Sequence, residues 1–350
     1  MILEDRIDAF KKLGVICGQP EQINSLHATI KLANHNNAWF TPKNIRFSLS
    51  AISHMLDSKL LSSWVSKYDI LFHNQRIGVI VSSNIPFIGF FDFLCILLSG
   101  NIFIGQLSSS NNILLPYLAS ILLEVNSDFS DYIFFERNIK NVDLLIATGS
   151  DNSAYYFHYT YASIKKIVRS NRTSVAILNG LESVDDYNKL ADDVYRYFGL
   201  GCRSVSKLFL PVNFNFDKIK EVFKELHFFE STVHYMDNYK YQKTLHIMND
   251  IDYIDCNNLL FVQSKEFDSP ISVLYYDYYE NLDDLVKLLE DYSNNIQCIV
   301  ANDNSIIKNT IPFGLSQKPT LYDYPDGLDV MKFITTNKTT DIPPNQCLEY

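Results

Sequence analysis

The stretch IGVIVSSNIPFIGFFDFLCILLSGNIFIGQL, residues 77–107, carries the pattern that predicts the fold. Ile77–Ser82 is a continuous apolar run, which is typical of a strand buried on both faces. After the break at Asn84-Ile85-Pro86, Phe87–Ser99 predicts a buried helix, and Asn101–Leu107 predicts the next strand. A strand, a helix and a strand in this order indicate a parallel sheet.

The same alternation continues toward the C-terminus. Further strands are predicted at residues 131–135, 142–147, 174–178, 207–211, 259–264, 271–279 and 297–302, and helices at 113–125, 152–159, 183–198, 216–228, 239–248 and 282–292. A basic connection precedes the strand at 174–178, and residues 1–70 are predicted to be helical, at 3–13, 28–34 and 42–61. The predicted fold class is therefore α/β, with a doubly wound, mostly parallel sheet.

Composition excludes several classes of protein. The chain has 350 residues, of which 47% are hydrophobic and 20% charged, so it is long enough for large cores and is not of disordered composition. Its net charge of −10 and the absence of a long Lys/Arg run argue against nucleic-acid binding. The acidic N-terminus does not resemble a signal peptide, and the apolar window Ile85–Leu98 is too short for a membrane span. We expect a cytoplasmic protein.

A single cysteine stands at the centre of YFGLGCRSVSK, residues 197–207. Gly199 and Gly201 permit a tight turn after the predicted helix, and the thiol of Cys202 could sit at this corner beside Arg203, a cation that could hold a thiolate. The alternative is a buried cysteine in a turn that only ends the helix. The six cysteines show no CxxC spacing and the histidines no HExxH, so the sequence predicts no metal site.

Polar residues follow three of the predicted strands, at Ser82-Ser83-Asn84, Ser108-Ser109-Ser110 and Thr148-Gly149-Ser150. In a parallel sheet the strand ends meet at one edge, and helix N-termini there suit phosphates. Each triplet could also be a helix N-cap without further function. Together they favour a nucleotide site, although the chain has neither GxGxxG nor a Walker A loop. The Asn84 amide could also donate to an oxyanion.

The order of these motifs resembles the aldehyde dehydrogenase superfamily, and most closely its acyl-CoA reductase branch, the LuxC-type fatty acyl reductases. The similar segments are NIPFIGFFDFLCILLSGNIFIGQLSSSN, IATGSDNSAYYF, NRTSVAILNGLESVDDYNKLADDVYRYFGLGCRSVSKLF, EFDSPISVLYYDYYENLDDLVKLLED and IPFGLSQKPTLYDYPDGLDVMKFI, which together cover about residues 69–334. The resemblance implies an aldehyde-dehydrogenase-like fold. Its expected parts are N-terminal helices with an NAD(P)-binding domain (1–200), a catalytic domain (201–320), and a return segment with a tail (321–350).

The resemblance also implies roles for individual residues. Cys202 would be the nucleophile and Asn84 the oxyanion donor. The residues implied at the cofactor are Thr148, Gly149, Ser150, Gln106, Ser108 and Glu266, with Glu266 at the nicotinamide ribose. Gln106 replaces the family's usual lysine, and a neutral amide binds a 2′-phosphate less strongly, which leaves NADPH or NADH open. Val168 stands where hydrolytic members have a general-base glutamate, which fits an enzyme that passes its acyl group to and from a thiol.

The expected activity is NAD(P)H-dependent reduction of a fatty acyl-CoA thioester to the aldehyde, through an S-acyl intermediate on Cys202 and without a metal. Three rings after Asn84, those of Phe87, Phe90 and Phe91, could line an acyl channel or only pack in a helix core. Two alternatives stay open: the acyl donor could be an acylated partner protein such as a ligase, or the chain could be a non-catalytic nucleotide-binding scaffold. We expect a homo-oligomer.

Overall fold

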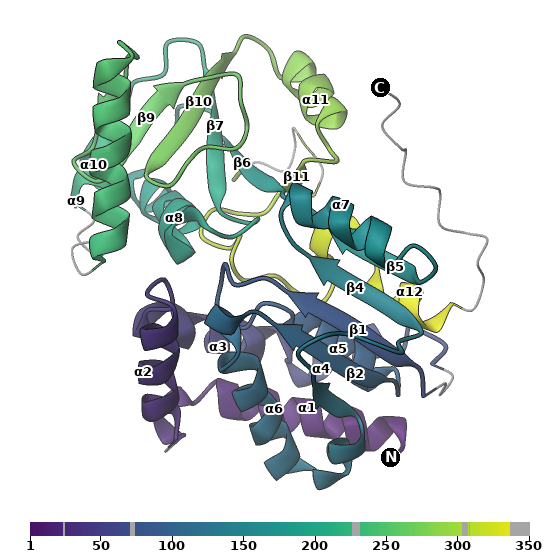
Figure 1. Ribbon diagram of the computed structural model, residues 1–350. Coiled ribbons are helices and arrows are strands. Elements are labelled where there is room, and N and C mark those ends of the chain that lie inside the picture. Colours follow the sequence, from purple (N-terminus) through teal and green to yellow (C-terminus); the bar gives the residue numbers. More distant parts are fainter. Residues whose placement is uncertain (24, 71–73, 226–231, 303–306, 308, 337–350) are drawn as a thin grey trace.

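The chain folds into two lobes, each built around its own β-sheet (Figure 1). The computed structural model describes residues 1–23, 25–70, 74–225, 232–302, 307 and 309–336. The first lobe contains the N-terminal half and the second most of the remainder. The chain then returns to the first lobe, where α12 packs against α5.

The first sheet has five parallel strands in the order β3-β2-β1-β4-β5. Their bounds are β1 Arg76–Val81, β2 Ile102–Leu107, β3 Ile133–Phe135, β4 Leu144–Thr148 and β5 Lys165–Arg169. The order runs outward from β1 in both directions, so the sheet is doubly wound and its topological switch point lies between β1 and β4. The predicted fold class is confirmed.

The register of β1 sets the level at which the strands end. Ile80 lies opposite Gln106 of β2 on one side and Ala147 of β4 on the other. The chain segments that follow β1, β2 and β4 therefore leave the sheet at one edge, as the sequence predicted for the three polar triplets.

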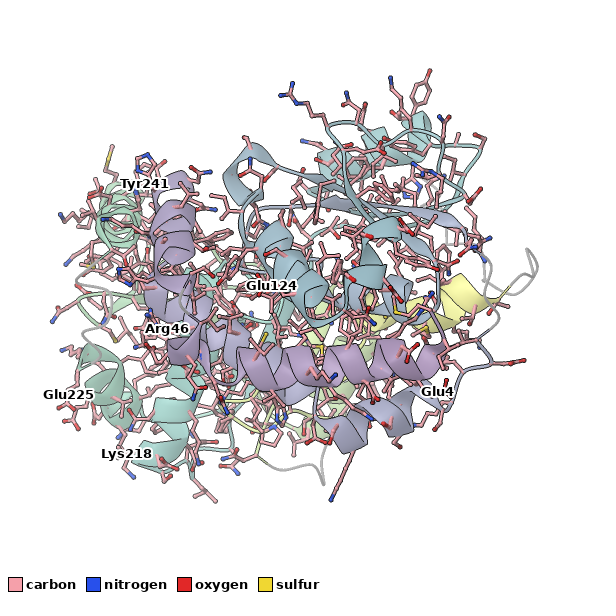
Figure 2. The ribbon with its side chains drawn as sticks, turned by 90° about the horizontal axis from the view of Figure 1, so that it is seen from below. Glu4, Arg46, Glu124, Lys218, Glu225 and Tyr241 are labelled. Atoms are coloured by element: carbon pink, nitrogen blue, oxygen red, sulfur yellow. The ribbon has the colours of Figure 1, made fainter. Side chains whose placement is uncertain are left out.

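Helices cover both faces of this sheet. One face is covered by a large helical layer, in which α5 Phe90–Leu98 contacts β2. The helices of this layer that share the same hydrophobic core are α1 Leu3–Cys17, α2 Leu26–Asn36, α3 Pro42–Met55, α4 Ser58–Val65, α6 Leu114–Val125 and α12 Val330–Thr335. The other face carries α7 Asp151–Thr160, whose Phe157 packs against Ile80 and Leu145. In Figure 2 the molecule is seen from the side of α1, with Glu4 of α1 and Glu124 of α6 on its outer surface.

The second sheet has the order β11-β6-β7-β10-β9-β8, and only the β8–β9 pair is antiparallel. The strands are β6 Thr173–Ile177, β7 Val205–Pro211, β8 Ile254–Asp255, β9 Leu260–Gln263, β10 Val273–Tyr279 and β11 Ile296–Val300. One face packs against α8 Val184–Tyr195, α9 Asp217–Glu225 and α10 Val233–Met248, and the other against α11 Leu282–Asp291.

Several predicted elements differ from the structure. The segment interpreted as a basic connection contains β5, an edge strand whose three Lys and Arg residues hid the strand pattern. The predicted helix 42–61 is two helices, because Asp57 caps a new one. The chain changes sheets between β5 and β6. The domain boundary expected at residue 200 stays a prediction. Residues 226–228 of one predicted helix and the tail 337–350 lie outside the described residues.

A buried ion pair joins α5 to the end of β5. The guanidinium of Arg169 donates to both carboxylate oxygens of Asp92 at 2.7 and 2.8 Å, and the two side chains are only 8% and 3% exposed. This bidentate geometry compensates for part of the desolvation of the two charges. The pair fixes the C-terminal end of β5, where the Arg169 carbonyl accepts from the Gly149 N–H group.

We expect Arg169→Met to lower the free energy of unfolding by about 3–5 kcal/mol, because it leaves the Asp92 carboxylate buried without a partner. Urea denaturation would measure this loss. The double variant D92L/R169M should recover most of it. Lys11→Met, which breaks the exposed pair of Lys11 with Asp8, is the control and should cost under about 1 kcal/mol. An R169M loss no larger than that of K11M would contradict the prediction.

Candidate active site

The turn before Cys202 has an unusual backbone. Helix α8 ends at Tyr195, and Tyr197, Phe198 and Gly199 then all take left-handed conformations, with φ of 56°, 60° and 77°. Only glycine takes this conformation without strain, and two aromatic residues in it require support from their surroundings. The predicted glycine turn is present, but it begins two residues before the first glycine.

That support comes from the first lobe. The Tyr197 hydroxyl and Ser48 Oγ of α3 are hydrogen-bonded at 2.7 Å. The ring of Phe198 packs on Trp39, with 5.3 Å between ring centroids. These two contacts thus hold the Cys202 turn of the second lobe against the first lobe.

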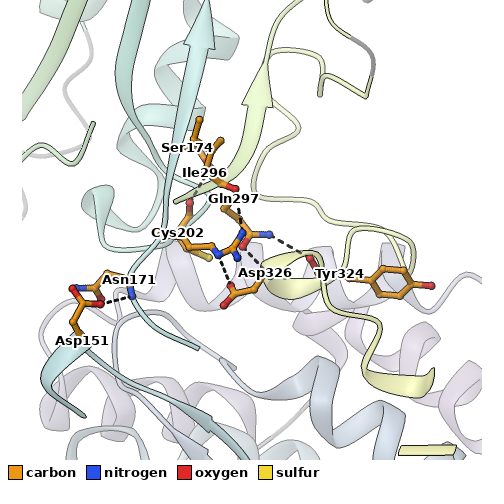
Figure 3. Close-up of polar contacts among 9 residues, drawn as sticks. Asp151, Asn171, Ser174, Cys202, Ile296, Gln297, Tyr324 and Asp326 are labelled. Carbon is orange, nitrogen blue, oxygen red and sulfur yellow. Dashed lines mark hydrogen bonds and ion pairs between the residues drawn. The ribbon is translucent and has the colours of Figure 1, made fainter. Parts of the chain in front are cut away.

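Cys202 lies at the junction of the lobes and is exposed. Its carbonyl accepts a hydrogen bond from Ser174 Oγ of β6 at 2.8 Å (Figure 3). A Cβ atom on the adjacent Gly201 would lie 3.4 Å from Ile85 Cγ2, so the Asn84-Ile85-Pro86 turn packs on the cysteine turn. The structure therefore brings together the regions of Asn84 and Cys202, which are far apart in sequence. The Asn84 amide is exposed and makes no hydrogen bond with the described residues.

The surroundings of Cys202 act on its thiol in opposite directions. Dense packing around the sulfur removes water and raises its pKa above the ordinary value, although the residue keeps an opening to solvent. The charges of Arg203 and Arg169 lower the pKa, and that of Asp326 raises it. The net pKa is raised, so at neutral pH the thiol is mostly protonated in the free protein.

These charges predict opposite effects of two variants on alkylation. Asp326→Asn should speed iodoacetamide labelling of Cys202 at pH 8, and Arg203→Met should slow it, because the first change lowers the pKa of the thiol and the second raises it, and the thiolate is the reacting form. Mass spectrometry of the Cys202 peptide over a pH series measures both rates. Asp8→Asn, an exposed charge on α1, is the control. Slower labelling of D326N would contradict the assignment.

Asp326 belongs to a polar cluster that the sequence did not point to. It lies in the turn Pro325–Gly327 with φ of 57°, and its carboxylate is 3.7 Å from the guanidinium of Arg172. Gln297 of β11 accepts from the Asp326 N–H group at 3.0 Å and donates to the Tyr324 carbonyl at 3.4 Å (Figure 3). Only the fold brings these residues to Cys202, so no local sequence pattern could have identified them.

The three polar triplets lie at the edge where β1, β2 and β4 end. Ser150 caps α7 by accepting from the Ser153 N–H group, and it is exposed. Gly149 is needed for close packing, because a Cβ there would lie 2.7 Å from Ser153 Cβ. Ser82 Oγ is buried without a hydrogen-bond partner among the described residues. An unsatisfied hydroxyl beside an exposed helix N-terminus at the switch point fits a dinucleotide.

Two further predicted cofactor residues, Gln106 and Ser108, have different surroundings from each other. Gln106 Oε1 accepts from the Ile139 N–H group at 3.0 Å, so this side chain already holds the β3–β4 connection. Ser108 Oγ is 3.3 Å from Ser110 Oγ, and both hydroxyls stay partly exposed at the end of β2. Ser108 thus remains at the predicted edge, while Gln106 has a structural partner of its own.

Glu266 lies on the β9–β10 connection, where its side chain is exposed. The connection is held from behind by Lys207, a fully buried residue of β7 whose Nζ donates to the Ser264 carbonyl. The connection faces α7 of the first lobe, since the Asp151 charge there helps raise the pKa of Asp268. Glu266 and Thr148–Ser150 are therefore on the two sides of the interlobe junction.

The burial of Lys207 leads us to expect that the free energy of unfolding depends on pH in a specific way. Burial lowers the pKa of Lys207 from 10.5 to about 8, against the opposing charges of Asp277 and Glu266. Between pH 8 and 10.5 the Lys207 side chain binds more protons in the unfolded chain than in the folded one, so it should contribute a rise of the free energy of unfolding with pH of up to about 3 kcal/mol. Buried cysteines and tyrosines with raised pKa act in the opposite direction, equally in wild type and variant, so chemical denaturation should show the rise as the difference between the wild type and Lys207→Met. Lys189→Met, which removes an exposed lysine, should follow the wild type, and a K207M curve parallel to the wild-type curve would exclude this contribution of Lys207.

Phe87, Phe90 and Phe91 are buried in the core of the first lobe. Phe91 packs on Trp64 and Tyr324, and Phe90 on Phe93. None of them lines the cavity beside the cysteine turn, which measures about 510 Å³. These rings occupy the helix-core positions that the sequence left open as the alternative to a channel.

Within the described part of the chain, no three His, Cys, Asp or Glu side chains are grouped so as to hold a metal ion. Over the same residues, no helix has the length and apolar character needed to cross a membrane.

The sequence model of the acyl-CoA reductase (LuxC) family matches residues 28–228, which is more than half of the chain. The chain belongs to the LuxC acyl-CoA reductase family. The matched region includes β1 to β7, the Asn84 turn and the Cys202 turn. Membership makes this LuxC-family chain an oxidoreductase with chemistry of the aldehyde and acyl reductase type. A search of curated protein sequences finds no match.

Solved structures with the same fold are aldehyde dehydrogenases. Aldehyde dehydrogenase 21 from Physcomitrella patens, in complex with succinate, aligns with a TM-score of 0.66 at 12% identity, over 94% of this chain and 79% of that one. An NAD-dependent aldehyde dehydrogenase from Sinorhizobium meliloti gives 0.65 at 13% identity, over 88% and 72%. An indole-3-acetaldehyde dehydrogenase complexed with NAD+ gives 0.62 at 10%, over 86% and 72%. The LuxC-family chain therefore has the aldehyde dehydrogenase fold.

Proposed function

We propose that this LuxC-family chain reduces an acyl thioester to the aldehyde, with Cys202 as the nucleophile and a nicotinamide dinucleotide as reductant. The observation that carries the proposal is the packing of the Asn84 turn against Gly201. This contact joins the turn of the free Asn84 amide to the turn of the exposed Cys202 thiol, at the edge where the strands of a doubly wound sheet end, and so supports a shared role for the two groups. A nucleophile, an oxyanion donor and a nucleotide edge are the parts that acyl reduction needs.

The first half of the reaction transfers the acyl group to the protein. Cys202 Sγ loses its proton and attacks the thioester carbonyl carbon, and the carbonyl electron pair moves to oxygen. The Asn84 amide donates to this oxyanion. When the oxyanion collapses, the bond from carbon to the thiol of the donor breaks, and the thiolate leaves and takes up a proton. The product is an S-acyl thioester on Cys202.

The second half releases the aldehyde. The bound dinucleotide supplies the hydride, and Thr148, Gly149, Ser150, Ser108 and Glu266 would hold it at the interlobe junction. After the acyl carbon has accepted the hydride, the Asn84 amide again holds the oxygen, and collapse breaks the bond between carbon and Cys202 Sγ. Val168 lies within β5 and offers no carboxylate that could activate water. This supports removal of the acyl group from Cys202 by hydride reduction or by transfer to a thiol, rather than by hydrolysis.

The two lobes would divide this work. The first would hold the dinucleotide, the second would present Cys202, and the return segment would close the junction through Tyr324 and Asp326. In the structure Gln106 is paired with Ile139, so a ribose 2′-phosphate would meet no lysine at this position. The affinities for NADH and NADPH should therefore differ less than they would in a protein with a lysine at this position.

The proposal predicts the outcome of acylation with a series of acyl-CoA thioesters. Wild-type protein should gain the acyl mass on the Cys202 peptide, and Cys202→Ala should show neither this mass nor aldehyde formation. Cys298→Ser is the matched control, because it replaces the nearby thiol and keeps a partner for Ser174. Asn84→Ala should slow aldehyde formation by roughly 10²–10³-fold through loss of the oxyanion donor.

Aldehyde formation by C202A would overturn the nucleophile. Acylation that appears only when an acylated partner protein is added would identify that protein as the donor in place of acyl-CoA.

A further inference from the structure

The cavity beside the cysteine turn has an unusual lining. It measures about 510 Å³, which is within the range of small-molecule sites. Segments of both lobes form it, namely the end of α2, the segments after β1 and β2, Leu200 and α10, and α2 and α10 lie on the same side of the molecule in Figure 1. Its lining residues are Asn36, Asn37, Ala38, Trp39, Ser83, Asn84, Ser110, Leu200, His234 and Asn238.

This lining joins three apolar residues, Ala38, Trp39 and Leu200, to seven polar ones, and none of the ten is Asp, Glu, Lys or Arg. Four of the ten side chains are asparagine amides, two are serines and one is a histidine. Several polar atoms have bonding capacity left. The Asn238 amide nitrogen donates to the His234 carbonyl at 2.8 Å, while its Oδ1 accepts from no described residue. Asn84 is unpaired among the same residues. Asn37, in contrast, is engaged on both atoms, by the Ser83 carbonyl and by the Trp39 N–H group.

The cavity adjoins the position of the thioester carbonyl. Asn84, the proposed oxyanion donor, is part of its wall, and Leu200 lies two residues before Cys202. In the proposed mechanism, the substituent of a carbonyl held between the Asn84 amide and Cys202 Sγ would enter this opening. The rings of Phe87, Phe90 and Phe91, for which the sequence left an acyl channel and a helix core open, are packed in the core of the first lobe.

We infer that this cavity receives the acyl group and selects acyl chains that carry uncharged hydrogen-bonding groups, such as amides or hydroxyls, over plain alkyl chains of the same length. This inference rests on the proposed function. An alkyl chain would cover the amides of the wall without replacing their hydrogen bonds to water, whereas a chain with an amide can pair with them. One net hydrogen bond of ordinary strength corresponds to roughly ten-fold in rate or affinity.

The test compares matched thioesters. 6-Acetamidohexanoyl-CoA and nonanoyl-CoA have acyl chains of equal length, and the same two acyl groups are also offered as S-ethyl thioesters, which lack the amides of the CoA arm. The rate of acylation of the Cys202 peptide, measured by mass spectrometry, should be about ten-fold higher for the acetamido chain with both leaving groups.

Two variants assign the preference to the cavity. Asn238→Leu should reduce it to about two-fold or less, because the amide at the rim is lost. Asn188→Leu is the matched control, since Asn188 also donates to the carbonyl four residues earlier on an exposed helix face, at 3.0 Å, and should leave the preference intact.

The remaining outcomes each decide against the inference. Equal or faster acylation by nonanoyl-CoA would overturn it while leaving Cys202 as the nucleophile. A preference that is seen with CoA and lost with S-ethyl thioesters would place the thiol arm of the donor, not the acyl group, in the cavity. A preference unchanged in N238L would locate the selection elsewhere. Absence of acyl mass with all four thioesters would overturn the proposed function itself.

Discussion

The parallel pairing of β1 with β2 on one side and β4 on the other is the constraint on which the site depends. Because Ile80 is level with both Gln106 and Ala147, three chain segments leave the sheet at one height. The sheet is buried on both faces, by the large helical layer and by α7, so a shift of one residue would turn apolar side chains of each face toward the wrong layer. The hydrophobic core thereby fixes the positions of the polar residues that follow the strands.

A second constraint is that the cysteine turn is held by both lobes. Its aromatic residues bind to Ser48 and Trp39 of the first lobe, and the Cys202 carbonyl is held by Ser174 of the second sheet. These contacts offset the strain of left-handed aromatic residues, and they couple the position of the thiol to the relative placement of the lobes. A thiol in such a junction is partly desolvated, which explains why its pKa is raised although Arg203 and Arg169 lie near it.

Much of the fold was predictable because its strands are apolar and its helices amphipathic. β5 was not predicted, because an edge strand rich in Lys and Arg lacks the apolar pattern of the other strands. Helix α8 ends earlier than predicted because Tyr197 leaves the helical conformation. Contacts with residues far away in the sequence stabilise the conformation that Tyr197 adopts. Of the predicted site residues, those after β1 and β4 lie together at one sheet edge, whereas Gln106 serves the β3–β4 connection and Phe87, Phe90 and Phe91 serve the core.

The α/β class, the resemblance to acyl-CoA reductases and the choice of Cys202 and Asn84 as candidate site residues all follow from the amino-acid sequence, because they depend on local patterns and on motif order. The side chains that surround Cys202 are known only from the tertiary structure, which brings Asp326 from the return segment and Arg169 from the end of β5. It alone showed that the neighbouring cavity is lined by amides rather than by phenylalanines. The physical reason is that a cavity wall is assembled from segments far apart in the chain, and each contributes residues whose orientation is set by the packing behind them.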